Sequence, residues 1–192
     1  MARLILVRHG ESVANAERRF THGPHEPLSR KGREEALERA RQIAARFDPV
    51  ALYASPFVRA LETARLIGSV LGLAPVVVEA LQEQDFGQLR GQGYDSVRSD
   101  PTWHTDRWRY RPPGGETLEE VFHRVGPALD AIADRHLGEQ VVVVSHGGVM
   151  AALHAWTTVR RVEGVAQVSA NASGYVVERR STAWAGPFPI DE

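Results

Sequence analysis

Two arginines and two histidines stand where short apolar runs of this sequence end. Arg8 and His9 come directly after the apolar run 4–7, and His146 follows four valines and a serine. Arg59 lies just beyond a third apolar run. A buried guanidinium needs an anion as its partner, because an unpaired charge away from water is costly. Arginine also matches phosphate oxygens in pairs. We therefore expect these cations to surround a phosphoryl group.

The elements that must position these residues are predicted from periodicity. Four apolar runs predict buried strands at 4–7, 51–54, 75–79 and 141–144. Helical spacing predicts helices at 30–47, 56–71 and 118–136, with a further helix after Gly148. Ser55 is the expected N-cap of the second helix, and Thr117 with Glu120 predicts a capping box for the third. The tail 165–178 predicts two more short strands with a turn near 171–174.

Continuous apolar strands indicate burial on both faces. Their alternation with helices predicts an α/β fold with three layers, in which helices cover both faces of a mostly parallel central sheet. We expect a single domain over 1–192. The polar, aromatic and proline-rich segment 84–115 breaks the alternation, and we interpret it as a small, lid-like insertion over the carboxyl ends of the strands.

Ligands of open α/β sheets bind beyond the carboxyl ends of the strands. Arg8, His9, Arg59 and His146 are all expected at that edge, and the run 75–79 leads to Glu83 in the same place. Helix N-termini after Gly10, Ser55 and Gly147 would add backbone N–H donors for an anion.

Composition excludes several other classes of function. The formal charge is −1 over 192 residues, so no basic field favours nucleic acid. The chain has no cysteine, and its N-terminal apolar run is too short for a signal peptide or a membrane span. Its eight histidines lack metal-ligand spacing, so we expect neither metal nor cofactor. The prediction is a cytoplasmic protein with a small-molecule partner and no membrane or nucleic-acid partner; the oligomeric state is not predicted.

Five motifs in order resemble the histidine phosphatase superfamily, the phosphoglycerate-mutase-like fold. They are Arg8-His9-Gly10-Glu11 with Asn15, Ser55-Pro56 with Arg59-Ala60 and Thr63-Ala64, Leu81-Gln82-Glu83 leading into Phe86-Gly87, Pro113-Gly114-Gly115-Glu116, and Ser145-His146-Gly147-Gly148. Together they span residues 4 to 148, most of the chain.

The resemblance implies a phosphohistidine mechanism without metal. His9 would be the nucleophile, with Nε2 neutral and the proton on Nδ1 held by a backbone carbonyl. Glu83 would protonate the leaving oxygen and then activate water. The resemblance assigns the phosphoryl oxygens to Arg8, Asn15, Arg59 and His146.

Two departures favour the phosphatase branch over the mutases. The mutases carry a Ser-Gly-Trp stretch after the first motif, whereas this chain has Phe20-Thr21-His22-Gly23, and its insertion is also shorter. We therefore predict a phosphomonoester hydrolase that acts on a small phosphorylated metabolite, with Thr21 and His22 as substrate neighbours. A phosphoglycerate-type mutase and a catalytically reduced phospho-ligand-binding relative stay open as alternatives.

The insertion also carries candidate recognition residues. Residues 98–111 hold four arginines and two aspartates, interleaved with Trp103, Trp108 and Tyr110. One interpretation is a cover whose aromatic side chains pack on the sheet edge. The other is a recognition surface for a second anionic or ring-containing part of the substrate. The arginines assigned to that surface are Arg107, Arg109 and Arg111.

Overall fold

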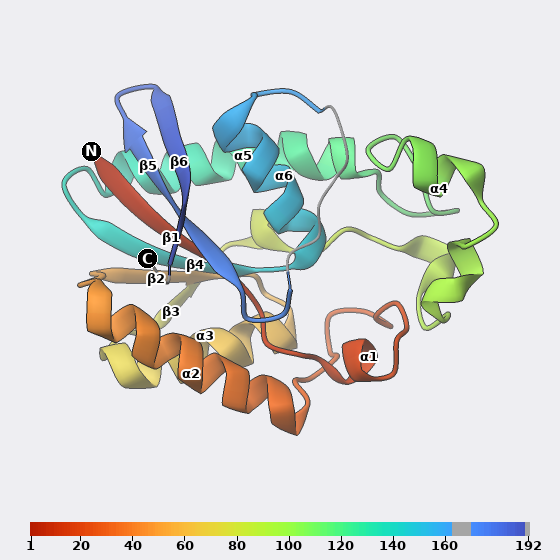
Figure 1. Ribbon diagram of the computed structural model, residues 1–192, viewed down its shortest axis with the longest axis horizontal. Helices are drawn as coiled ribbons and strands as arrows, with labels where there is room; N and C mark the ends of the chain where they lie inside the picture. The colour runs from red at the N-terminus through yellow and green to blue at the C-terminus, as the bar shows by residue number, and fades with distance from the viewer. Residues whose placement is uncertain (163–169, 191–192) are drawn as a thin grey trace.

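A six-stranded sheet lies at the centre of the computed structural model, which describes residues 1–162 and 170–190 (Figure 1). The strand order is β3-β2-β4-β1-β5-β6. The four strands β1 to β4 are parallel, whereas β5 and β6 are antiparallel at one edge. This arrangement confirms the predicted α/β fold with a mostly parallel sheet. The strands are β1 (Ala2–Arg8), β2 (Ala51–Ala54), β3 (Pro75–Val77), β4 (Gln140–Ser145), β5 (Gly174–Arg180) and β6 (Ala183–Pro189).

Helices cover both faces of the sheet. The pair α2 and α3 packs on one face, and the pair α5 and α6 packs on the other (Figure 1). In the described part of the chain, no helix is both long and apolar enough to cross a membrane. The helices are α1 (Val13–Ala16), α2 (Arg30–Arg46), α3 (Val58–Leu71), α4 (Pro101–Thr105), α5 (Leu118–Arg135) and α6 (Gly147–Thr158), with 3-10 turns η1 (Glu79–Leu81), η2 (Gly87–Leu89) and η3 (Tyr94–Val97).

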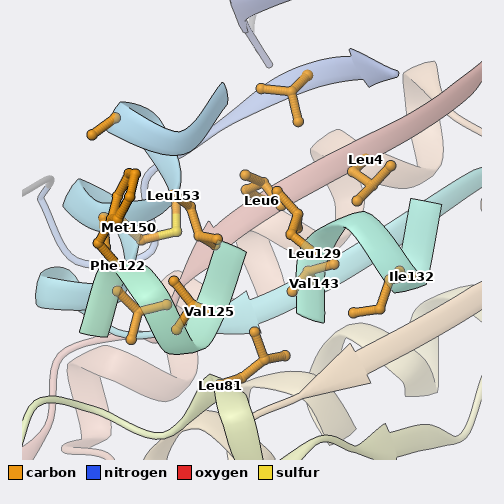
Figure 2. Packing of buried hydrophobic residues seen from close by; sticks show 14 of the residues in the cluster. Leu4, Leu6, Leu81, Phe122, Val125, Leu129, Ile132, Val143, Met150 and Leu153 are labelled. Carbon is orange, nitrogen blue, oxygen red and sulfur yellow. The ribbon is translucent and has the colours of Figure 1, made fainter. Parts of the chain in front are cut away.

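The alternation of side chains along each strand explains the three layers. Leu4 and Leu6 point into the cluster beneath α5 and α6, whereas Ile5 and Val7 point into the cluster beneath α2 and α3. All four side chains are fully buried. Figure 2 shows the first cluster, where Leu4 and Leu6 lie close to Leu129 of α5. Continuous apolar strands are thus explained by helices on both sides.

Of the two predicted caps, one is confirmed and one is wrong. Thr117 with Glu120 forms a complete capping box at α5. Ser29, which was not predicted, caps α2. Ser55 does not cap α3, which begins at Val58 after an N-cap at Phe57. The Ser55 hydroxyl is occupied elsewhere, since it lies 2.7 Å from a ring nitrogen of His146.

The tail differs from its prediction in one strand. The first strand predicted within 165–178 falls mostly on residues 163–169, which lie outside the described residues. The second corresponds to β5, which begins at Gly174 after a turn. The edge strand β6 was not predicted, because its sequence contains Gly186, Pro187 and Pro189. Proline lacks an N–H to donate and is tolerated at a sheet edge.

The insertion has a small apolar cluster of its own. Its members are Phe20, Leu89, Val97 and Tyr110, with Phe86 and Trp103 packed against them. Backbone hydrogen bonds join the Phe20 N–H to the Gln92 oxygen and the Gly91 N–H to the Phe20 oxygen. The segment with α4 lies beyond the carboxyl end of β1, on the same side as α1 (Figure 1). The assignment of residues 84–115 as a lid-like insertion within a single domain stays a prediction.

A close contact between α5 and α6 gives a stability prediction. A Cβ at Gly126 would lie 2.1 Å from the Trp156 ring, and that ring is held by a 3.1 Å hydrogen bond to Asp130. Gly126→Ala should lower the free energy of unfolding by about 1–3 kcal/mol in urea titrations, as overpacking does. The loss is expected even though alanine is the better helix former.

The matched control is Gly93→Ala. Gly93 has φ −61°, and a Cβ there would meet no atom within 4 Å. Its free energy of unfolding should stay level or rise slightly. Equal stabilities for the two variants would contradict the proposed contact between α5 and α6.

Candidate active site

The carboxyl ends of β1 and β4 bring two imidazoles together. The two strands are neighbours, and Arg8 pairs with Ser145 in their register. His9 and His146 are the next residues along, and their ring centroids lie 5.1 Å apart in an edge-on arrangement. Both side chains are buried, with exposed fractions of 2% and 0%.

The loop after β1 is fixed from two helices. A Cβ at Gly10 would lie 2.2 Å from the Gly32 oxygen of α2, so the close approach requires glycine. The Gly10 N–H donates to Thr63 Oγ1 of α3 at 3.1 Å. Thr63 in turn donates to the Arg59 carbonyl oxygen at 2.8 Å. The backbone that carries His9 is therefore held by both α2 and α3.

The hydrogen bonds of His9 determine its tautomer. Its Nδ1 lies 2.6 Å from the Gly10 carbonyl oxygen, which can only accept, so Nδ1 carries the proton. Nε2 then has a lone pair, and Arg59 Nε donates to it at 3.2 Å. Burial lowers the pKa of His9 well below its usual value, and the charges of Arg59 and Arg8 lower it further. His9 is therefore a neutral imidazole with Nε2 available as a nucleophile.

Arg59 lies in the first turn of α3 and is 2% exposed. Its Nη1 donates to Thr21 Oγ1 and to the Gly23 oxygen, each at 3.3 Å. Burial lowers the pKa of Arg59 to about 10. Burial also lowers the pKa of Arg8, against the attraction of Glu83. Both groups remain cations at neutral pH, so the charges of a buried arginine, Arg59, and a half-buried one, Arg8, act on His9.

His146 is supported by Ser55. Its Nε2 lies 2.7 Å from Ser55 Oγ, and that oxygen also accepts the Phe57 N–H at 3.3 Å. Burial, followed by Arg59, lowers the pKa of His146 well below its usual value. Among the described residues, none forms a hydrogen bond with its buried Nδ1. With the Ser55 hydroxyl donating to Nε2, Nδ1 is the nitrogen left to donate to a ligand.

Glu83 is held beside the two histidines by the start of α6. The Gly148 N–H donates to Glu83 Oε2 at 3.4 Å, and the Gln84 N–H donates to Oε1 at 2.9 Å. The preceding turn is tied to β4, because Ser145 Oγ donates to the Leu81 oxygen at 2.7 Å. A Cβ at Gly148 would lie 2.7 Å from Glu83 Oε1. This position therefore needs glycine for the carboxylate to approach.

Two adjoining cavities meet at Glu83. The larger, of about 680 Å³, contains His9 and both flanking arginines, and the smaller is about 560 Å³. Glu83, Thr21 and Phe86 line both cavities. His146 is not among the residues that line either cavity, and its ring lies edge-on to that of His9.

Only some of the remaining predicted site residues line the two cavities. Asn15 and Arg107 line the larger cavity, and Arg111 lines the smaller one. His22 and Arg109 line neither. His22 is exposed and its ring lies against Gly91, whose missing Cβ makes room for it. Arg109 forms ion pairs with Asp106 and Glu119 at the surface.

Sequence reasoning overlooked Tyr94. Its hydroxyl oxygen accepts a hydrogen bond from the Asn15 side-chain amide at 3.1 Å, and the residue lines the larger cavity. The residue belongs to a short 3-10 turn within the insertion, where no periodicity marks a position as facing a site. The capping box of α1, formed by Ser12 and Asn15, was overlooked as well.

No cluster of three or more potential metal ligands occurs within residues 1–162 and 170–190. The charges that face a ligand here come from guanidinium groups. Backbone N–H groups at the start of α6 complement them, since Gly147 and Gly148 line the larger cavity. The other two helices predicted to face the site begin later than expected, α1 at Val13 and α3 at Val58, and their first turns also reach the larger cavity through Asn15 and Arg59.

Comparisons with known proteins identify relatives of this chain. The chain is 32% identical over 189 residues to a metal-independent phosphoserine phosphatase of Arabidopsis thaliana. The matched region covers 94% of this chain and 78% of the relative. It is 36% identical over 165 residues to a 2,3-bisphosphoglycerate-dependent phosphoglycerate mutase of Parvibaculum lavamentivorans, covering 78% of this chain and 77% of the relative.

A solved structure and a family model also match this chain. The mycobacterial glucosyl-3-phosphoglycerate phosphatase, solved in complex with VO3, has a TM-score of 0.84 and 27% identity, covering 95% of this chain and 96% of that one. The model of the histidine phosphatase superfamily, branch 1, matches residues 4–186. With Arg8, His9, Arg59, Glu83 and His146 gathered at one sheet edge, the chain belongs to the histidine phosphatase superfamily.

Proposed function

We propose that this protein is a metal-independent phosphomonoesterase that transfers the phosphoryl group of a small phosphorylated metabolite to His9 and then to water. The observation that carries the proposal is the state of His9. Its Nδ1–H donates to the Gly10 carbonyl oxygen, and its neutral Nε2 accepts a hydrogen bond from Arg59, with the charge of Arg8 also opposing protonation. Relatives named as phosphoserine and glucosyl-3-phosphoglycerate phosphatases support hydrolysis of phosphate esters.

In the first step, the Nε2 lone pair of His9 attacks phosphorus while the bond to the ester oxygen breaks. Arg8 and Arg59 offset the charge on the phosphoryl oxygens, and such electrostatic stabilisation accounts for most of the catalysis of phosphoryl transfer. Glu83 gives its proton to the leaving oxygen, which leaves as an alcohol. The neutral start of His9 matters, since an imidazolium has no lone pair to attack with.

In the second step, water replaces the alcohol. Glu83, now a carboxylate, takes a proton from water as the oxygen attacks phosphorus. The P–N bond breaks, inorganic phosphate forms and His9 returns to its neutral state. His146 Nδ1 and Asn15 would donate to the phosphoryl oxygens throughout.

A mutase is the second candidate, favoured by the phosphoglycerate mutase relative. The two functions differ in the fate of the phosphoryl group. Incubation with 3-phosphoglycerate and observation by ³¹P NMR separates them, because a phosphatase gives inorganic phosphate and a mutase gives an isomeric ester. A protein with neither product and no activity on an aryl phosphate would be the phospho-ligand-binding relative.

The first prediction concerns His9. Rapid quenching under alkaline conditions should capture a phosphoryl group on this residue, stable in base and lost in acid. His9→Ala should fold normally and lose nearly all turnover, and treatment with EDTA should leave the wild type active. A variant that keeps turnover within about tenfold, equivalent to a barrier change under about 1.4 kcal/mol, would exclude His9 as the nucleophile.

The second prediction concerns protonation. In NMR titrations, the His9 ring should stay neutral well below pH 6.5, because burial and then Arg59 lower its pKa. An Arg59→Met variant should raise the pKa of His9, whereas Arg109→Ala should not. The unfolded imidazole binds a proton near pH 6.5. The stability from neutral His9 is therefore complete above that pH and declines as the pH falls below it. An unchanged His9 titration in Arg59→Met would contradict this electrostatic explanation.

The third prediction concerns Glu83. A general acid matters most for a poor leaving group, so Glu83→Gln should slow alkyl phosphate hydrolysis far more than aryl phosphate hydrolysis. Gly148→Ala should reproduce the same selective loss, since its Cβ would displace the carboxylate. Equal losses on the two substrates in Glu83→Gln would show a purely electrostatic or structural role.

A further inference from the structure

Arg124 of α5 donates four hydrogen bonds close to the loop that carries Glu83. Its Nη1 donates to the Ala80 carbonyl oxygen at 2.7 Å and to the Gln82 carbonyl oxygen at 3.0 Å. Its Nε and Nη2 donate to the two carboxylate oxygens of Glu116, at 3.0 and 2.7 Å. The planar guanidinium therefore binds both the backbone that precedes Glu83 and a carboxylate beside it.

Glu116 extends this support to the residues that follow Glu83. Its carbonyl oxygen accepts the Gln84 side-chain amide at 2.6 Å, and its N–H donates to the Asp85 carbonyl oxygen at 2.8 Å. The Asp85 N–H donates in return to Glu116 Oε2 at 3.4 Å. The chain on both sides of Glu83 is thus bonded to one ion pair, the Arg124–Glu116 pair.

The pair lies outside the place where a phosphoryl group would bind. Arg124 is not among the residues that line either cavity, and Glu116 lines the smaller cavity but not the one that contains His9. Glu83 lines both cavities. Any effect of the pair on phosphoryl transfer must therefore act through Glu83.

The carboxylate of Glu83 depends on its backbone for its position. One oxygen accepts the N–H of the adjacent Gln84 at 2.9 Å, and the other accepts the Gly148 N–H at 3.4 Å, which is long for such a bond. A general acid must lie within hydrogen-bond reach of the leaving oxygen. A displacement of about 1 Å can lower a rate about 100-fold.

We propose, building on the function above, that Arg124 and Glu116 are positioning residues, which hold the carboxyl group of Glu83 where it can protonate the leaving oxygen. They act without touching the substrate. Their loss therefore affects the step that needs a proton more than the attack by His9.

The test assays ethyl phosphate and para-nitrophenyl phosphate on the same preparation of each variant. Arg124→Gln should lower kcat/KM for the ethyl ester at least about tenfold more than for the aryl ester, because the poorer leaving group needs the proton. Partial unfolding lowers both rates by the same factor and leaves their ratio unchanged. Glu116→Gln should shift the ratio in the same direction by a smaller factor, since its backbone bonds to Asp85 and Gln84 remain.

The matched control is Arg3→Gln. Arg3 donates from Nε and Nη2 to Glu178 Oε1 at 3.2 and 2.8 Å, which forms another partly buried ion pair near the start of β1, away from His9. Breaking this pair also removes a partner from a buried carboxylate and should lower stability. The ratio of the two rates should stay at the wild-type value.

A double variant tests whether Arg124 acts through Glu83. Glu83→Gln already lacks the proton donor, so adding Arg124→Gln should change the ratio little further. Fully additive selective losses would overturn the proposal. Equal losses on the two esters in the single variants Arg124→Gln and Glu116→Gln, beside a selective loss in Glu83→Gln, would also overturn it.

The Gly148 amide gives a readout without turnover. It donates to Glu83 Oε2 from a different helix, so its proton chemical shift reports the position of the carboxylate. The shift should change in Arg124→Gln and Glu116→Gln and stay constant in Arg3→Gln. An unchanged shift in the first two variants would overturn the proposal. A changed shift together with equal losses on the two esters in Glu83→Gln would show that the pair positions the carboxyl group while the proposed role of Glu83 as an acid fails.

Discussion

The hydrogen bond between His9 Nδ1 and the Gly10 carbonyl oxygen is the contact on which the rest of the site depends. It fixes which ring nitrogen is protonated and so leaves the lone pair on Nε2, where Arg59 donates to it. That bond requires a backbone turn tight enough for residue 10 to fold back onto the ring of residue 9. The turn is held by the approach of Gly10 to Gly32 of α2 and by the Thr63 hydroxyl of α3. Two helices on one face of the sheet thereby set the chemistry at its edge.

The second constraint is electrostatic. Withdrawing Arg8, Arg59 and Arg107 from water around one cavity costs free energy, and this desolvation lowers their pKa values. Burial keeps His9 and His146 neutral, and the charges of Arg59 and Arg8 oppose their protonation further. An anion that enters the cavity removes both the repulsion between the cations and part of their desolvation cost. A site of this kind is therefore complementary to a phosphoryl group before any substrate binds, and little reorganisation accompanies the reaction.

Elements of the fold and the site were predictable from the sequence where local patterns mark them, and not where tertiary packing alone decides a residue's place. β1, β4 and α5 were predicted because continuous apolar runs and a capping box are local patterns that burial on the sheet reinforces. The placement of His9 and His146 at one edge follows from parallel strands. Ser55 was misread because its hydroxyl serves a residue 91 positions away rather than its own helix. Arg107 and Arg109 have the same type and the same neighbourhood in sequence, and only tertiary packing separates the cavity-lining arginine from the exposed one.

The insertion is anchored apart from the strands that carry His9 and His146. Trp108 packs into the main core under α5, whereas Tyr110 packs into the small cluster around Phe20. These two anchors fix the backbone directly after Arg107, so its guanidinium reaches Trp103 without support from the catalytic strands. The proposed nucleophile His9, by contrast, directly follows β1, and Arg8 and Arg59 lie in β1 and α3. Changes in the insertion can therefore alter what the cavity accepts and leave the turn at Gly10 intact. That separation gives a physical reason why relatives of this fold carry names as different as a mutase, a phosphoserine phosphatase and a glucosyl-3-phosphoglycerate phosphatase.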